Sequence, residues 1–286
     1  MKIAYHFNVH HDPRQFSWLF NAVYNPHDYF SIHIDRRADP ETARGFFDII
    51  RGLPNVHATR RISVRWGGWS ICQSELISLR DMLRRYSDWS YFTVLSGFDY
   101  PLRPREEIVA YLEQRRDANF IQGAPIAEMS LEIRSRHKRM HFEVRDEVRS
   151  FRIPYLRRPP YPLRLKGSGW HVITRPFSEW ILSDPVARRC RSYIRFVYIP
   201  DEMWMQYLIE NSPFLSSWVN DDLREIVWEE RPDMPGAHKA HPEILTRNHL
   251  GLLETSRAFF ARKFDRTIDS DVLHRLARRI GVAPAE

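Results

Sequence analysis

The chain has 286 residues, of which 43% are hydrophobic, and its 43 lysines and arginines outnumber its 36 aspartates and glutamates to give a formal charge of +7. This length fits one large domain or two small ones, and the charge favours a polyanionic partner such as a nucleotide, a nucleic acid or an anionic membrane surface. Cys72 and Cys190 are too few for a disulfide framework and lack a metal-binding spacing. Because no signal peptide or transmembrane-length apolar run is found, we expect a cytoplasmic protein, either free or peripheral on the inner face of the cell membrane.

The order of apolar segments predicts an α/β fold. Phe16, Leu19 and Phe20 recur with helical spacing between two short apolar runs, so a strand, a helix and a second strand fall within the first forty residues. Strands are expected at residues 2–9, 29–35, 55–57, 91–95, 119–121 and 167–173. Helices are expected at residues 14–23, 40–50, 74–86, 106–115, 177–182, 201–210 and 269–280.

Residues 134–166 differ in composition from the rest of the chain. They are rich in arginine, proline and tyrosine, with the sequence RRPPYP at residues 157–162. Because proline removes a backbone donor and fixes φ, we expect no regular structure there. We interpret the segment as an extended basic loop that covers the core of a single domain at residues 1–286, and not as a linker.

Two adjacent cations, Arg262 and Lys263, lie within the aromatic sequence FFARKFD at residues 259–265. Since aromatic side chains favour burial, the pair is expected at the wall of a pocket. Arginine offers a planar fork for phosphate oxygens and lysine a compact charge, so together they could neutralise a diphosphate without a metal ion. The alternative is a basic pair on a loop that caps a hydrophobic cluster.

Carboxylates stand at the expected ends of a helix and a strand. Asp201 and Glu202 follow Pro200 at a predicted helix start, where the helix dipole favours the ionised form that a general base needs. The alternative is that both acids only cap the helix. Asp35 closes a predicted strand, and ligands of open α/β sheets bind beyond the carboxyl ends of strands. Its alternative is an ordinary turn residue.

The sequence WGGWS at residues 66–70 places two glycines between indoles, which can stack on a planar ring or a sugar. Its spacing matches neither common phosphate-binding glycine loop. The sequence DSD at residues 269–271 is an acid-x-acid pattern, but it opens the last predicted helix, where aspartate and serine are ordinary caps. No metal site is therefore expected.

Seven segments together resemble one family. They are NVHHD at residues 8–12, FSIHID at 30–35, WGGWS at 66–70, LSGFDYPLR at 95–103, GSGWHVI at 167–173, PDEMW with YLIENSP at 200–213, and FFARKFD at 259–265. In this order they resemble the core-2/I-branching N-acetylglucosaminyltransferase and peptide O-xylosyltransferase family. The resemblance implies a GT-A-like nucleotide-sugar-binding fold, with a mixed central sheet flanked by helices, that needs no divalent metal or other cofactor.

The resemblance also implies roles for single residues. Glu202 corresponds to the catalytic base, and Arg262 with Lys263 corresponds to the pair that replaces the metal ion at the donor diphosphate. Contacts to the nucleotide are implied for Val9, His10, Asp35, Arg65 and Trp66. Positions facing the transferred sugar and the acceptor correspond to Asp99, Gly169 and Trp170.

These positions predict an inverting glycosyltransferase of a bacterial type that uses a UDP-sugar, with xylose or N-acetylglucosamine as the transferred sugar. The acceptor would be a glycan, a lipid-linked glycan or a peptide. The xylosyltransferases carry an acid where this chain has Gly169, which counts against xylose and against a peptide serine. UDP-glucuronic acid is an alternative donor, and a basic nucleic-acid-binding module is the alternative from another class.

Overall fold

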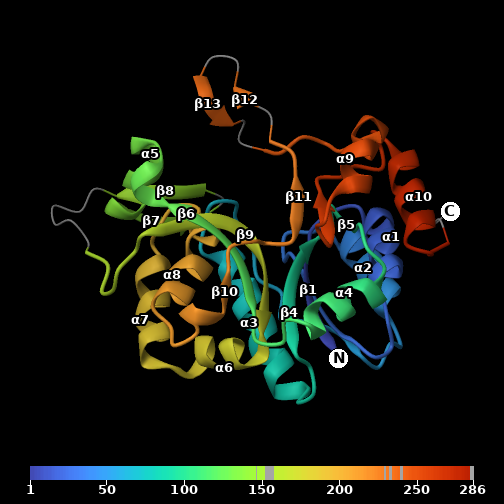
Figure 1. Cartoon of the computed structure of the whole chain (residues 1–286), viewed down its shortest axis with the longest axis horizontal. Coiled ribbons are helices and arrows are strands. Elements are labelled where there is room, and N and C mark those ends of the chain that lie inside the picture. Colours follow the sequence, from blue (N-terminus) through green and yellow to red (C-terminus); the bar gives the residue numbers. More distant parts are fainter. Residues whose placement is uncertain (146, 152–157, 229, 232–233, 239–240, 284–286) are drawn as a thin grey trace.

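The computed structural model describes residues 1–145, 147–151, 158–228, 230–231, 234–238 and 241–283. Its centre is a seven-stranded sheet of order β10-β6-β9-β4-β1-β2-β3 (Figure 1). The strands are β1 (Ile3–Val9), β2 (Tyr29–Ile34), β3 (Val56–Ala58), β4 (Tyr91–Ser96), β6 (Asn119–Pro125), β9 (Leu165–Thr174) and β10 (Trp218–Val219). β9 runs antiparallel to β4 and β6, whereas the other pairs are parallel. The expected mixed α/β sheet is confirmed.

Helices cover both faces of this sheet and enclose two hydrophobic cores (Figure 1). The residues of β1 alternate between them: Phe7 packs in one core and Ala4 in the other, as the two-residue period of a strand requires. The first core is closed by α1 (Pro13–Val23), α2 (Pro40–Ile50), α4 (Arg105–Glu113), α9 (Leu250–Thr255) and α10 (Ser270–Arg279). The second is closed by α3 (Ser70–Arg85), α6 (Arg175–Ser183), α7 (Pro185–Ile194) and α8 (Trp204–Glu210).

Local capping explains where several helices begin. Asp39 accepts hydrogen bonds from the backbone N–H groups of Glu41 and Thr42, and Pro40 occupies the first helical position of α2. Asp269 caps α10 in the same way, accepting from the N–H groups of Asp271 and Val272. The interpretation of residues 269–271 as a helix cap is therefore confirmed.

A small second sheet joins distant segments of the chain. Its order is β11-β14-β5, with β11 (Arg224–Ile226), β14 (Phe260–Arg262) and β5 (Asp99–Pro101). The register places Arg262 opposite Asp99. Phe259, Phe260 and Phe264 are buried, which confirms the aromatic setting expected around the basic pair. A separate short ribbon consists of β12 (Glu230–Arg231) and β13 (Met234–His238).

The expectation that residues 134–166 lack regular structure is wrong. The segment contains the end of α5 (Leu131–Ser135), a hairpin of β7 (Met140–Val144) and β8 (Glu147–Phe151), and the first residues of β9. The prolines lie beyond the hairpin, and Phe142 packs against Phe151 across it at 5.5 Å between ring centroids. Part of the proline-rich stretch, residues 152–157, lies outside the described residues. We call the described residues between 131 and 166 the arm; its helix α5 and its hairpin of β7 and β8 lie at the upper left of Figure 1.

Other elements also differ from expectation, among them α7, α9 and the turn that carries Glu202. The helix α7 was not predicted, although Asp184 caps it and Pro185 opens it. Asp201 and Glu202 do not begin a helix: they form a three-residue 3-10 turn after Ile199, and α8 begins at Trp204. The positive φ of 51° at Ile199 and the non-helical Met203 separate this turn from its neighbours. The helix-dipole argument for Glu202 therefore does not hold.

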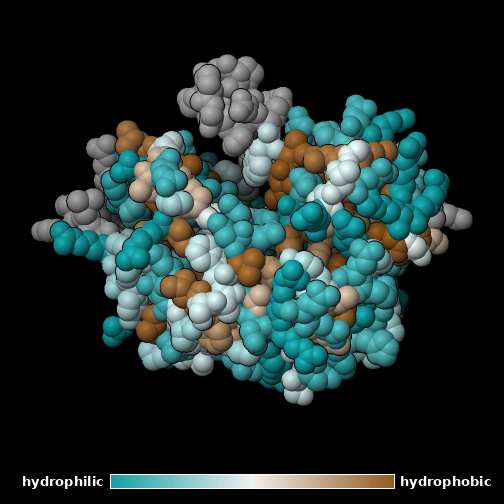
Figure 2. All heavy atoms as spheres, in the orientation of Figure 1, coloured by the Kyte–Doolittle hydropathy of each residue, from teal (hydrophilic) through white to brown (hydrophobic). Residues whose placement is uncertain are grey.

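Both cysteines, Cys72 and Cys190, are buried and free. Within the described part of the chain, none of the helices combines the length and apolar character needed to span a bilayer. Most of the face shown in Figure 2 is hydrophilic, with apolar residues in small groups.

Candidate active site

Val9, His10 and Asp35 meet at the carboxyl ends of β1 and β2. The Asp35 N–H donates to the Val9 carbonyl over 2.9 Å, which aligns the two strand ends. Burial lowers the pKa of His10, the positive charges of Arg37 and Lys263 lower it further, and Asp35 opposes them. Asp35, Arg37 and Lys263 all influence His10 because they lie near the same strand ends. The structure thus brings together Val9, His10, Asp35 and Lys263, which the sequence assigned to one site.

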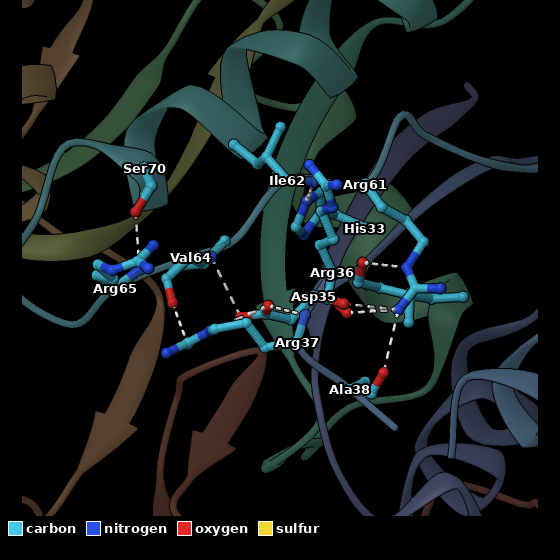
Figure 3. Close-up of polar contacts among 11 residues, drawn as sticks. His33, Asp35, Arg36, Arg37, Ala38, Arg61, Ile62, Val64, Arg65 and Ser70 are labelled. Atoms are coloured by element: carbon cyan, nitrogen blue, oxygen red, sulfur yellow. Dashed lines mark hydrogen bonds and ion pairs between the residues drawn. The ribbon is translucent and has the colours of Figure 1, made fainter. Parts of the chain in front are cut away.

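The Asp35 carboxylate organises the loops around it (Figure 3). It accepts from the Arg37 N–H at 2.8 Å, from Arg37 Nη2 at 3.0 Å and from the Val64 N–H at 3.2 Å. Burial by itself raises the pKa of Asp35, but the hydrogen bonds from Arg37 and Val64 outweigh it and leave that pKa below its ordinary value. Asp35 is thus an ionised anchor that fixes the wall of the candidate nucleotide site.

Arg61 supports the same wall through backbone carbonyls and was not recognised in the sequence. Its guanidinium donates to the carbonyls of Ile34 at 3.2 Å, Asp35 at 2.8 Å and Ala38 at 3.3 Å (Figure 3). The only sequence signal is one arginine among several, because these carbonyls become neighbours only once β2 and the segment after β3 are paired.

Arg65 and Trp66 lead from this wall into the glycine loop. The Arg65 N–H donates to Ser70 Oγ over 2.7 Å, and the Trp66 side chain remains 55% exposed. Trp66 meets the Tyr198 ring edge-on at 6.1 Å between centroids. Trp69, by contrast, is half-buried and packs against the buried Trp204, so Trp66 is the more exposed of the two indoles.

The glycine loop is closely covered on both sides. Gly67 has a φ of 73°, and a β-carbon there would lie 2.8 Å from the Tyr198 ring. A β-carbon on Gly68 would lie 2.4 Å from Glu143 Oε1 of the hairpin. That same oxygen accepts from the Ser70 N–H at 2.6 Å, so the hairpin supplies the cap that α3 lacks locally. The glycines allow close approach of protein groups as well as of any ligand.

Arg262 is a buried cation with hydrogen-bonding capacity to spare. Its Nε lies 3.5 Å from Asp99 Oδ1, and its guanidinium stacks 4.4 Å from the centroid of the Trp170 ring. Neither this Nε nor Asp99 Oδ1 has a hydrogen-bond partner among the described residues. Burial lowers the pKa of Arg262, while Asp99 and Asp201 counteract it. Three residues expected at the site are therefore in direct contact.

Lys263 points toward the strand-end residues. Its Nζ lies 4.7 Å from the centroid of the Phe98 ring, and its charge is felt by His10. A cis peptide bond joins it to Arg262. The contacts of the two side chains place them toward different parts of the site, with Lys263 toward the nucleotide residues and Arg262 toward Asp99 and Trp170.

Arg224 is a second buried arginine that the sequence did not reveal. It donates from Nη2 to the Val94 carbonyl at 2.8 Å and to Thr93 Oγ1 at 3.1 Å, and it packs over the Phe260 ring at 4.4 Å. Burial lowers its pKa to about 10, with Asp99 and Asp222 opposing the shift. Its charge adds to the positive potential that Arg262 creates at this point.

Gly169 leaves room for the side chain of Asp201. A β-carbon on Gly169 would stand 3.3 Å from Asp201 Oδ2. Asp201 Oδ1 is inaccessible and has no hydrogen-bond partner among the described residues. Burial and the adjacent charge of Glu202 raise the pKa of Asp201 to about 7. The site thus contains a carboxyl group that is partly protonated at neutral pH, which the sequence did not indicate.

Glu202 is bound by two cations of the arm. Its Oε2 lies 2.9 Å from Arg136 Nη1 and 2.9 Å from Lys166 Nζ. The residue sits just after Ile199, whose N–H donates to the Gly67 carbonyl at 3.0 Å. The expected base is therefore held between the arm and the glycine loop.

Two cavities flank these residues. One of about 190 Å³ lies under the hairpin and is lined by Gly68, Trp69 and Glu143 among others. A more open hollow of about 440 Å³ lies beside the Asp35 wall, against Arg36 and Arg61. Among the described residues there is no group of three His, Cys, Asp or Glu side chains that could hold a metal ion.

Comparison with known proteins gives the chain a context. The protein-family model described as "Branch: Core-2/I-Branching enzyme" matches residues 3–253. Xylosyltransferase 2 of Canis lupus familiaris is 31% identical over 96% of this chain, and that of Homo sapiens is 30% identical over the same share. Xylosyltransferase 1 of Homo sapiens is 26% identical. The chain spans about a third of the length of these relatives: 33% of each xylosyltransferase 2 and 30% of xylosyltransferase 1.

Solved structures are more distant. The crystal structure of S. aureus TarS is similar with a TM-score of 0.41 at 11% identity, covering 100% of this chain and 67% of that one. A second TarS structure, in complex with UDP, gives a TM-score of 0.39 at 12% identity.

Proposed function

Because the chain belongs to the Core-2/I-branching enzyme family, we propose that it is an inverting, metal-independent glycosyltransferase. It would move a sugar, with xylose or N-acetylglucosamine as the first candidates, from a UDP-sugar to a hydroxyl group of a glycan or other acceptor, forming a β linkage. The observation that carries the proposal is the buried Arg262 guanidinium, paired with Asp99, stacked on Trp170 and adjacent to Lys263.

The nucleotide would bind at the carboxyl ends of β1 and β2. There Asp35 is already ionised and fixed by three hydrogen bonds, and Val9 and His10 lie at the adjoining strand end. Trp66 offers an exposed indole at the edge of the same wall. A rigid, preformed surface of this kind lowers the entropic cost of binding a ligand.

Arg262 and Lys263 would stabilise the charge that develops on the leaving diphosphate. Since that charge grows as the glycosidic bond breaks, their help is larger in the transition state than in the ground state. The Arg262 guanidinium supports this role, because it is buried and its Nε makes only a 3.5 Å ion pair with Asp99 and no hydrogen bond among the described residues.

Glu202 would act as the general base. It takes the proton from the acceptor hydroxyl, and the acceptor oxygen then forms a bond to the anomeric carbon as the bond from that carbon to the diphosphate breaks. UDP leaves with the bonding electron pair. Attack from the face opposite UDP converts an α-linked donor into a β-linked product.

The donor sugar would lie between Asp99, Trp170 and the space above Gly169. Because Gly169 has no side chain, the neighbouring carboxyl of Asp201 borders that space. Xylose, N-acetylglucosamine and glucuronic acid differ in the group at C2 or beyond C5, and this small region would have to distinguish them. Glycans, lipid-linked glycans and peptides remain candidate acceptors.

A donor screen tests the proposal directly. UDP release would be measured with UDP-xylose, UDP-N-acetylglucosamine and UDP-glucuronic acid, each with and without EDTA. We expect turnover of one donor that is unaffected by the chelator. A strict need for manganese would refute the metal-independent scheme, and thermal stabilisation by duplex DNA but not by UDP would favour a nucleic-acid-binding module instead.

A further inference from the structure

Two cations from opposite ends of the arm neutralise Glu202. Arg136 precedes the hairpin and Lys166 follows the proline-rich stretch, yet both lie 2.9 Å from the same carboxylate oxygen. Their side chains are only 13% and 16% exposed. The charges of these groups sum to +1 before any substrate binds.

Protonation of Glu202 would remove the anion with which Lys166 forms its ion pair in the described part of the chain. When the carboxyl group accepts a proton it becomes neutral, and both cations are left partly buried beside it. Breaking a partly buried ion pair from one side is unfavourable, because the remaining charge is uncompensated. The reaction therefore needs a replacement anion at this position.

The neighbouring carboxyl groups are poor replacements. Glu132 reaches Arg136 only at 3.6 Å, and its side chain is 79% exposed, so solvent screens the pair. Asp201 adjoins Glu202, but burial raises its pKa to about 7 and leaves it only partly ionised at neutral pH. Arg262 and Lys263 already face the position proposed for the diphosphate, which leaves the acceptor as the source of the anion.

The surroundings of Arg136 suit a sugar ring with an acidic group. The Arg136 guanidinium lies 5.9 Å from the centroid of the Tyr198 ring, which contacts Trp66 and stacks on His141 at 5.3 Å. Aromatic faces of this kind pack against the apolar C–H face of a sugar. Further cations of the arm are exposed and form no ion pair with any residue the structure describes: Arg134, Lys138, Arg139, Arg145 and Arg158.

We propose that Arg136 and Lys166 form an acceptor subsite for an acidic saccharide, one that carries a carboxylate or phosphate near the hydroxyl group to be glycosylated. The inference rests on the proposed function, since it names the acceptor class of the same site. The acceptor's anion takes over the two cations, which frees Glu202 to receive the hydroxyl proton. The acidic group itself forms no covalent bond. When the product leaves, the two cations pair with Glu202 again.

Binding measurements with a matched set of acceptors test the subsite. The probes are a tetrasaccharide containing glucuronate, the same tetrasaccharide with its carboxyls reduced to alcohols, and the reduced form bearing a phosphate monoester. We expect the acidic forms to bind about tenfold or more tightly than the reduced form at low salt. Comparison of the carboxylate and phosphate probes identifies which acid is preferred.

Variants then locate the effect. Arg136→Met and Lys166→Met should each remove most of the preference, whereas Lys166→Arg should keep it. Arg164→Met is the matched control, since this exposed arm cation pairs with Glu210 and not with Glu202. Equal binding of acidic and reduced probes, or a preference that survives both methionine variants, would overturn the inference.

Donor turnover separates this inference from the function on which it rests. The acidic tetrasaccharide should accelerate UDP release in the wild type far more than the reduced one. Binding of the acidic probe through Arg136 and Lys166, with none of the UDP-sugars turned over, would sink the glycosyltransferase proposal and leave the anion subsite intact. Turnover of a UDP-sugar at equal rates with the acidic and the reduced tetrasaccharide would support the glycosyltransferase proposal and contradict the anion subsite.

Discussion

The molecule contains two basic pairs that differ in what they already bind. Arg262 and Lys263 lie on and beside β14, within a strand whose aromatic neighbours are buried, and Arg262 Nε has no hydrogen bond among the described residues. Arg136 and Lys166 lie on the arm and share one carboxylate at 2.9 Å. Arg262 of the first pair meets Asp99 only at 3.5 Å and without a hydrogen bond, whereas both cations of the second pair lie 2.9 Å from the same anion.

This difference shows how similar residues can serve opposite needs. A leaving diphosphate gains charge during the reaction, so preorganised donors that are only weakly paired are most useful to it. A general base loses its negative charge when it takes the proton, so its cationic partners then need another anion. The four predictions that follow probe the two pairs, from the largest expected effect to the smallest.

Replacing Glu202, the shared partner of Arg136 and Lys166, with glutamine should have the largest effect on activity. Glu202→Gln keeps the shape of the side chain but cannot take a proton, so transfer should fall by about 10³ or more while UDP affinity stays nearly unchanged. Initial rates and calorimetric UDP titration measure the two effects. The control is Glu147→Gln, which removes another ion-paired carboxylate of the arm. Loss of UDP binding together with activity would rule out the assignment as base.

Arg262→Met tests the pair formed by Arg262 and Lys263. It keeps an apolar stem against Trp170 but removes the charge, and loss of one well-placed donor typically costs about 10²–10³ in rate. UDP should bind more weakly, whereas the ratio of rates among UDP-sugars should stay constant. Arg275→Met, an exposed ion-pair partner of Asp271, serves as control. A changed donor preference with unchanged UDP affinity would instead place Arg262 at the sugar.

Gly167→Ala tests how firmly the sheet positions the arm pair. A β-carbon at residue 167 would lie 1.9 Å from the backbone oxygen of Gln122, next to Lys166 where β9 pairs with β6. Overpacking against backbone should cost about 3 kcal/mol, which lowers Tm by about 6–12 °C for a chain of this size. Gly251→Ala is the matched control, because its added carbon would meet no described atom within 4 Å apart from its chain neighbours and the backbone of its own helix. Equal Tm values for the two variants would contradict the expected clash.

Asp201→Asn tests whether the pKa of the carboxyl group next to Glu202 is raised in the folded state. The pKa of Asp201 is raised from 3.8 to about 7 by burial and by Glu202, so the folded state binds this proton more tightly than the unfolded state does. The wild type therefore loses stability as pH rises from about 4 through about 7. Asparagine cannot ionise, so the variant should gain on the order of 2 kcal/mol relative to wild type across that window.

Denaturant unfolding at several pH values measures this difference in the free energy of unfolding. Asp271→Asn, at an exposed carboxylate, should show no comparable trend. A stability difference between Asp201→Asn and wild type that stays constant from pH 4 to pH 8 would mean that folding does not raise the pKa of Asp201.

Much of the fold follows from local sequence. The expected strands and most helices are confirmed, and the mixed sheet flanked by helices agrees with the GT-A-like fold class that the resemblance implied. The strands were accessible because a core strand such as β1 carries its apolar pattern within a few residues. The hairpin was missed because the prolines that follow it dominated the interpretation of the whole segment, and α7 because its arginines obscured Ala187 and Cys190.

The site was only partly accessible for a different reason. The motifs indicated Glu202, Asp35 and Arg262, and the structure brings Arg262 onto Asp99 and Trp170. The partners that tune them arise from tertiary contacts: Arg224 reaches β4 across 130 residues, and Arg136 reaches Glu202 across 66. No short pattern in the sequence encodes contacts between residues so far apart. The sequence therefore indicated the site residues but not the charged partners that set their protonation.

The contact between Gly68 and Glu143 has a consequence for sequence variation. The Glu143 carboxylate occupies the place that a side chain at residue 68 would fill, and it also caps α3 through the Ser70 N–H. In any relative with a β-carbon at the position of Gly68, the residue facing it from the hairpin must be shorter or turned away. Positions 68 and 143 should therefore change together across the family, although 75 residues separate them.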